Sequence, residues 1–131
     1  MSVVLIAVIA IVVVGIVWYS MNHGGTMNGA GAQRISPQEY QTNVAKQQHM
    51  LVDVRTAEEF QSGHIPGAVN IALQSLPERL ATLPKAQPIV LYCRSGARSS
   101  NAAQMLKRAG FEDVRDLGGI LTWQAQGLPV H

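Results

Sequence analysis

The sequence contains a single cysteine, Cys93, among 131 residues. One cysteine excludes an intramolecular disulfide, and it also excludes a second thiol that would resolve an adduct formed on the first. The four histidines, His23, His49, His64 and His131, are far apart and lack the spacing of metal ligands. We therefore expect neither a metal site nor a cofactor.

Charged side chains are absent from the first 33 residues, and all ten basic and eight acidic residues lie from Arg34 onward. The net charge is only +2, and the basic residues are scattered rather than clustered. This distribution argues against nucleic acid as a partner, because such proteins carry a basic patch or stripe. The length suits one domain with a core of modest size.

An apolar run, interrupted only by Gly15, extends from Val3 to Tyr19. A helix of this length spans about 25 Å, which is at the short end for crossing a bilayer. Trp18 and Tyr19 close the run, as interfacial aromatic residues do. We therefore predict a transmembrane anchor over residues 1–19.

A cleaved signal peptide is the alternative for this run, since Ala30-Gly31-Ala32 has the small-x-small form of a cleavage site. Against it, the N-terminal flank lacks Lys and Arg, and the site lies about a dozen residues beyond the apolar run. Residues 20–33 are rich in glycine and predict a flexible linker. The domain would then occupy residues 34–131. Arg34 and the lone thiol favour the cytoplasmic side of the membrane.

Strands and helices alternate along residues 34–131, which predicts an α/β domain. Such alternation favours a mostly parallel sheet of about five short strands with helices on both faces. Capping boxes at Ser36 and Thr56 mark two helix starts. The expected strands are 50–54, 69–71, 88–92 and 114–117, and the expected helices are 36–47, 56–61, 76–82, 99–109 and 120–126.

Cys93 lies between the strand at 88–92 and the helix at 99–109, at the strand end where such sheets bind ligands. Backbone N–H groups of the turn, the helix dipole and the charges of Arg94 and Arg98 favour a nucleophilic thiolate. A buried structural cysteine is the alternative. Two flanking arginines and the glycine-containing turn at Gly96 argue against it, so we predict a reactive cysteine in an anion-binding loop.

The loop Cys93-Arg94-Ser95-Gly96-Ala97-Arg98-Ser99 resembles the active-site loop of rhodanese-type sulfurtransferases. Further motifs follow in the family's order from roughly Ile35 to Val130. They are Leu51-Val52-Asp53-Val54-Arg55 with Glu58, Glu59 and Phe60, the turn from Gly63 to Ile71, and the segment from Gly110 to Gly119 with Trp123. The resemblance implies transfer of a sulfane sulfur through a persulfide on Cys93. The donor would be an anion such as thiosulfate, and the acceptor would be cyanide or a thiol.

In this interpretation Ser95, Gly96 and Ala97 contribute backbone N–H groups, and Gly96 lets the loop turn back over the sulfur. Arg98 would close the loop and bind the anionic donor, with Arg94 assisting, because a guanidinium matches an oxyanion. The Ser95 hydroxyl would either donate to the persulfide or contact solvent.

Asp53 and Arg55 lie at the end of the first core strand. We favour a structural ion pair or a helix cap there, with the rim of the pocket as the alternative. For His64 and Trp123 we favour structural roles over a general base and a pocket wall.

Two other functions remain possible at this stage. One is a membrane-tethered carrier that takes sulfur from a partner protein and has little activity on thiosulfate. The other is a phosphatase, which is disfavoured because protein-tyrosine phosphatases and related enzymes use Cys-x5-Arg, whereas four residues separate Cys93 from Arg98 here. The shorter loop suits a single outer sulfur atom better than a phosphoryl group.

Overall fold

The computed structural model describes residues 32–131. Five strands form one sheet in the order β1-β5-β4-β2-β3, and every pairing is parallel. The strands are β1 (Gln33–Arg34), β2 (Met50–Asp53), β3 (Val69–Asn70), β4 (Ile89–Cys93) and β5 (Val114–Gly119). The predicted α/β fold with about five short parallel strands is confirmed.

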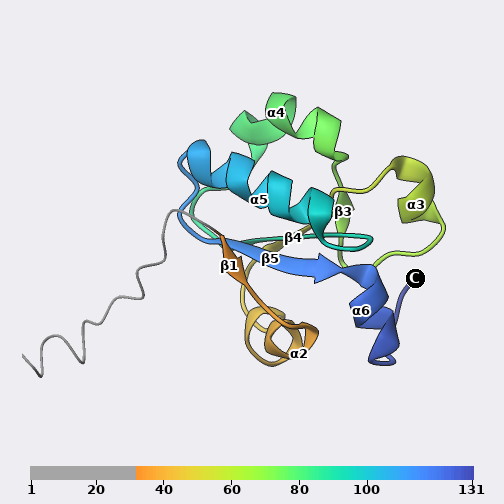
Figure 1. The fold of residues 1–131 in the computed structure, drawn as a ribbon. Helices are drawn as coiled ribbons and strands as arrows, with labels where there is room; N and C mark the ends of the chain where they lie inside the picture. Colours follow the sequence, from red (N-terminus) through yellow and green to blue (C-terminus); the bar gives the residue numbers. More distant parts are fainter. Residues whose placement is uncertain (1–31) are drawn as a thin grey trace, which may run out of the picture.

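Helices cover both faces of this sheet, with α4 and α5 on one face and α2 and α6 on the other (Figure 1). The helices are α2 (Pro37–Glu39), α3 (Ala57–Gln61), α4 (Leu76–Arg79), α5 (Ala97–Arg108) and α6 (Ile120–Ala125). Shorter turns are the π-helix η1 (Tyr40–Val44) and the 3₁₀ turns η2 (Leu73–Ser75) and η3 (Leu80–Thr82).

The central strand β4 divides the core into two layers, because successive side chains of a strand point to opposite faces. Ile89, Leu91 and Cys93 belong to the cluster beneath α5. Val90 and Tyr92 belong to the cluster on the other face, with Trp123 of α6. All five β4 residues are buried. The alternation therefore places the Cys93 side chain on the face that α5 covers.

The observed elements differ from the expected ones mainly at their ends. The helix expected over 36–47 has only three α-helical residues and continues as the π-turn η1. The Ser36 hydroxyl accepts a hydrogen bond from the Glu39 N–H at 3.1 Å, which is half of the capping box we expected. Helix α5 begins at Ala97, two residues earlier than expected, directly after the left-handed Gly96.

Strand β1 was missed because Gln33 and Arg34 are both polar and exposed and carry no apolar strand pattern. Gln33 pairs with Arg115, so the sheet begins inside the segment predicted as linker. The anchor predicted over 1–19 and the linker up to residue 31 lie outside the described residues. Among the helices of residues 32–131, none is long and apolar enough to cross a bilayer.

Candidate active site

The Cys93 side chain lies at the carboxyl end of β4, inside a tight loop that leads into α5. Gly96 turns the loop with a φ of +111° and ψ of −13°, a conformation that residues with a Cβ rarely adopt. This turn aims the Gly96 N–H at the cysteine, with 3.0 Å between its nitrogen and Cys93 Sγ. The loop thus places a backbone hydrogen-bond donor on the sulfur, as negative charge on that atom requires.

Ser99 lies on the first turn of α5, fully buried beside the sulfur. Its Oγ is 3.7 Å from Cys93 Sγ, from which it accepts the thiol hydrogen. Oγ also lies within donating distance of two carbonyl oxygens, Gly96 O at 3.1 Å and Gly118 O at 3.4 Å. One hydroxyl therefore connects the thiol, the loop and strand β5.

The end of β5 packs against the loop. The pairing of β4 with β5 shifts between Leu91 and Tyr92, so that Cys93 lies opposite Gly119. A Cβ at Gly119 would lie 2.5 Å from Arg94 O and 2.9 Å from the Ser95 Cα, which are distances that real side chains do not adopt. Glycine at this position is what allows the loop to pack on the strand.

Cys93 is 1% exposed, whereas the loop residues Arg94, Ser95 and Ala97 are exposed. Taken on its own, this burial is what a structural cysteine would show. The sulfur also has two polar contacts, with the Gly96 N–H and with Ser99 Oγ, which a cysteine that merely fills the apolar cluster beneath α5 would not need. The loop therefore has exposed residues on both sides of the buried Gly96, whose N–H contacts the sulfur.

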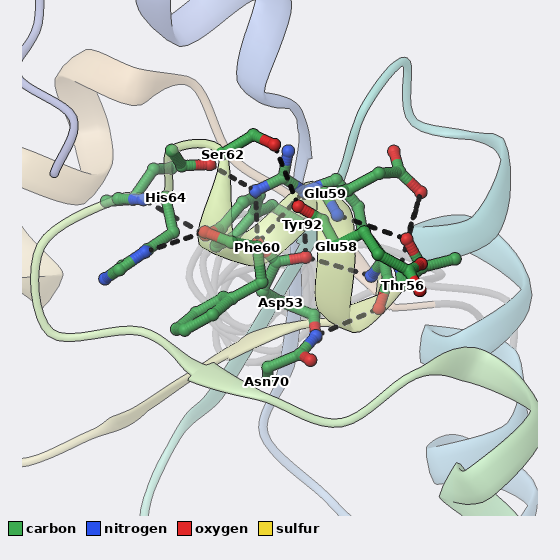
Figure 2. Close-up of polar contacts among 12 residues, drawn as sticks. Asp53, Thr56, Glu58, Glu59, Phe60, Ser62, His64, Asn70 and Tyr92 are labelled. Atoms are coloured by element: carbon green, nitrogen blue, oxygen red, sulfur yellow. Dashed lines mark hydrogen bonds and ion pairs between the residues drawn. The ribbon is translucent and has the colours of Figure 1, made fainter.

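Arg98 projects from α5 to Glu59 of α3, which sequence reasoning did not include in the site. The two side chains form a bidentate pair, with Nη1 2.7 Å from Oε1 and Nη2 2.9 Å from Oε2. Glu59 is itself placed by the capping box with Thr56, which Figure 2 shows. Hydrogen bonds from Arg98, aided by Thr56, lower the pKa of Glu59 to about 2.

Arg34 of β1 is a second residue that sequence reasoning missed. One terminal nitrogen of its guanidinium lies 3.7 Å from the position of a Cβ on Gly118 and 3.9 Å from that of a Cβ on Gly96. The side chain therefore lies against the back of the loop. Arg34 is thus a third arginine at the loop, in addition to Arg94 and Arg98.

Asp53 and Arg55 form the buried ion pair that we favoured. Arg55 Nη2 lies 2.6 Å from Asp53 Oδ2 and also donates to the Gly63 carbonyl at 2.7 Å. The Asn70 amide donates to the carbonyls of Asp53 and Arg55 (Figure 2). The pair thus ties the end of β2 to the turn at Gly63 and to strand β3, and Thr56 rather than either member caps α3.

Tyr92, next to the cysteine, lies on the opposite face of β4 and accepts a hydrogen bond from the Ile65 N–H. Burial raises the pKa of Tyr92 above its ordinary value. His64 stacks on Phe60, and its Nδ1 lies 3.0 Å from the Phe60 carbonyl oxygen. Trp123 packs in the core of the face opposite Cys93 and donates to Pro129 O. These contacts are structural.

These contacts define what the loop can do chemically. A buried sulfur with a hydrogen-bond donor aimed at it, in a loop that carries arginines, suits an anionic sulfur nucleophile that is shielded from bulk water. Within residues 32–131, no three His, Cys, Asp or Glu side chains come together in an arrangement that could hold a metal ion. In this part of the chain, the polar groups that contact Cys93 Sγ are the Gly96 N–H and the Ser99 hydroxyl.

Comparison with known proteins agrees with this description of the fold. Residues 36–126 match the rhodanese-like domain family, and the chain belongs to that family. A sulfurtransferase of Allochromatium vinosum is 43% identical over 62% of this chain and 77% of its own length.

This chain also matches most of the length of two further proteins. Thiosulfate sulfurtransferase GlpE of Pseudomonas savastanoi pv. phaseolicola is 38% identical over 71% of this chain and 88% of its own. The crystal structure of a rhodanese-related protein from Thermoplasma volcanium superposes with a TM-score of 0.69 at 28% identity, covering 76% of this chain and 97% of that one.

Proposed function

We propose that this protein is a sulfurtransferase that carries a sulfane sulfur on Cys93, from an anionic donor such as thiosulfate to cyanide or a thiol. The observation that carries the proposal is the Gly96 N–H held 3.0 Å from Cys93 Sγ by a left-handed glycine. Relatives named as sulfurtransferases match this chain over most of their length, which supports the same chemistry.

In the first step the Cys93 thiolate attacks the outer sulfur of thiosulfate. The new S–S bond forms on Cys93 while the S–S bond of thiosulfate breaks, and the electron pair of that bond leaves with sulfite. The enzyme then holds a persulfide anion on Cys93, one sulfur atom further from β4. Amide hydrogens of the loop stabilise this anion, as they do at other oriented backbone sites.

In the second step an acceptor such as cyanide attacks the outer persulfide sulfur. The persulfide bond breaks, its electron pair returns to Cys93 as a thiolate, and thiocyanate leaves. Because the sequence contains no second cysteine, the acceptor must come from outside the chain. Because Cys93 is 1% exposed, neighbouring groups must move aside before either reactant can reach the sulfur.

The phosphatase alternative is weakened by the contacts of Arg98. A Cys-x5-Arg enzyme needs the guanidinium of that arginine to hold a phosphoryl group, whereas both terminal nitrogens of Arg98 donate to Glu59. Activity on an aryl phosphate that disappears with Cys93→Ser would revive this alternative.

Steady-state kinetics with thiosulfate and cyanide test the proposal. We expect thiocyanate to form with parallel double-reciprocal lines, because the two half-reactions share a covalent enzyme intermediate. Cys93→Ser, which preserves the side-chain shape, should fold and produce no thiocyanate. Absence of thiocyanate from the wild-type protein would refute the activity on thiosulfate.

A carrier that receives sulfur from a protein is the second candidate, and one observation favours it. Leu121 is 47% exposed, and its N–H donates to Arg94 O at 3.3 Å, so an apolar side chain lies exposed next to the loop. A protein donor that covers Leu121 would contact the loop as well. Faster loading of Cys93 from a persulfurated protein than from thiosulfate, slowed by Leu121→Ser, would support the carrier.

The membrane anchor over residues 1–19 and the cytoplasmic location of the domain are also proposals. Their support is the apolar run up to Trp18 and Tyr19 and the position of Arg34 after it. Fractionation of cells that express the full chain tests the anchor. Labelling of Cys93 by a membrane-impermeant thiol reagent in intact cells would overturn the cytoplasmic location.

A further inference from the structure

Both terminal nitrogens of the Arg98 guanidinium are paired with Glu59. They donate one hydrogen bond to each oxygen of the carboxylate, at 2.7 and 2.9 Å. This fork-to-fork geometry is the one that an arginine uses to bind an oxyanion. A sulfonate oxygen of the donor therefore has to displace Glu59 before it can bind Arg98 in this way.

The carboxylate of Glu59 is held ready for this pairing. Thr56 donates to Glu59 Oε1 from both its N–H and its hydroxyl, at 3.3 and 3.2 Å, while the Glu59 N–H donates to Thr56 Oγ1. The lowered pKa of Glu59 keeps it ionised throughout the neutral range. The pair with Arg98 is thus the resting arrangement of the site, and it neutralises the charge of Arg98.

Arg94, the other arginine expected to bind the donor, differs from Arg98 in its side-chain contacts. It is exposed, and within residues 32–131 its side chain makes no hydrogen bond and no ion pair. Its backbone is nevertheless fixed, because its carbonyl oxygen accepts from the Leu121 N–H and lies against Gly119. Arg94 therefore presents an uncompensated charge from a rigid position directly after the cysteine.

We propose that Glu59 determines which arginine meets the anionic donor, by holding Arg98 as a positioning residue of the loop and leaving Arg94 as the donor-binding cation. This inference rests on the proposed sulfur transfer. It keeps Arg98 in its expected role of closing the loop but moves donor binding from Arg98, with Arg94 assisting, to Arg94. Glu59 acts through Arg98 and touches no substrate.

Two reagents of nearly equal size, iodoacetate and iodoacetamide, separate charge from access at Cys93. Both alkylate the sulfur, but only iodoacetate is an anion, so the ratio of their rates reports the charge that an anion meets. One unit charge close to the site changes this ratio by about fivefold. The measurement needs no sulfurtransferase activity, and intact mass counts the adducts.

Arg94→Gln should lower the iodoacetate rate about fivefold while the iodoacetamide rate stays constant, and it should raise the KM for thiosulfate more than it lowers kcat. Glu59→Gln releases Arg98 and should raise the iodoacetate-to-iodoacetamide ratio by a similar factor. Glu58→Gln is the matched control, because it removes the same charge from an adjacent, exposed residue whose side chain accepts no hydrogen bond within residues 32–131. Its ratio should change less than twofold.

The double variant Glu59→Gln/Arg94→Gln completes the test. If Arg98 takes over anion binding once Glu59 is neutral, Arg94→Gln should lower the iodoacetate rate by a smaller factor in this background than in the wild type. Equal ratios for Glu59→Gln and Glu58→Gln, or an unchanged ratio for Arg94→Gln, would overturn the inference. Arg94 is exposed and unpaired, so its variant remains informative if Glu59→Gln unfolds. A wild-type protein that forms no persulfide would refute the proposed function but leave the alkylation ratios to be judged separately.

Discussion

Gly119→Ala should disable the loop by pushing it away from β5. The added Cβ would lie 2.5 Å from Arg94 O, whereas ordinary contacts begin at 3.4 Å and real Cβ atoms do not come below 3.0 Å. The loop backbone must therefore move by between 0.5 and 0.9 Å at Arg94, one residue after Cys93. Such a shift also displaces the Gly96 N–H from its position over the sulfur.

The size of the effect follows from overpacking. Inserting a methyl group into a packed site costs about 1–3 kcal/mol, because neighbouring atoms leave their preferred positions. For a domain of this size each kcal/mol lowers the melting temperature by about 4–8 °C. Thermal unfolding followed by circular dichroism measures this cost, and thiosulfate:cyanide turnover measures the loss of activity, which we expect to exceed the loss of folded protein.

Gly127→Ala is the control for this change. Gly127 has a φ of +73°, and nothing lies within 4 Å of the place that an added methyl group would take, so alanine there strains only the backbone. That strain costs about 1–2 kcal/mol, a range similar to the cost of the clash, but it lies far from the loop in the chain and should leave turnover of the folded protein unchanged. If Gly119→Ala retained wild-type stability and turnover, the close packing of the loop on β5 would be refuted.

Three further predictions concern side chains around the loop. Asp53→Ala breaks a buried ion pair and should lower the free energy of unfolding, measured in urea, by about 3–5 kcal/mol. Asp113→Ala removes an exposed pair and should lower it by at most about 1 kcal/mol. Equal losses in the two variants would contradict the structure. Ser99→Ala should slow persulfide formation and lower stability by about 1–3 kcal/mol, and an unaffected variant would exclude the hydroxyl from the site. Because the pKa of Glu59 is lowered from 4.5 to about 2, its pair with Arg98 stabilises the fold fully above about pH 4.5 and loses this contribution as the pH falls toward 2. The stability difference between wild type and Glu59→Gln, at most about 1 kcal/mol, should vanish over that interval, and a difference that persists at pH 2 would contradict the pairing.

The position of Cys93 could be predicted because local signals determine it. The apolar strand before it, the glycine after it and the helical pattern from Ser99 onward all act over a few residues. The capping box at Thr56 was equally local, and the structure contains both of its hydrogen bonds. The parallel sheet followed from the alternation of such segments.

The burial of a side chain by distant segments could not be predicted in this way. The triplets Asp53-Val54-Arg55 and Asp113-Val114-Arg115 are identical in sequence, and each forms an ion pair between its Asp and its Arg. The side chains of Arg55 and Asp53 are 7% and 0% exposed, whereas those of Arg115 and Asp113 are 19% and 44% exposed. Tertiary packing alone makes this difference.

The residues of the site that the sequence did not predict also depend on tertiary packing. Glu59 and Arg98 are 39 residues apart, and Arg34 reaches Gly96 and Gly118 only after β1 has paired with β5. No periodicity or short motif connects such positions. The pairing of Arg98 with Glu59 was not expected for this reason, because Glu59 belongs to another helix.

The central claim is that Cys93 accepts a sulfur atom from an anionic donor. Intact mass of the purified full chain after incubation with thiosulfate, followed by removal of the excess, tests it most directly. We predict a gain of one sulfur atom that maps to Cys93, is removed by cyanide and is absent from Cys93→Ser. An unchanged mass of the wild-type protein, or an adduct that persists in Cys93→Ser, would contradict the account.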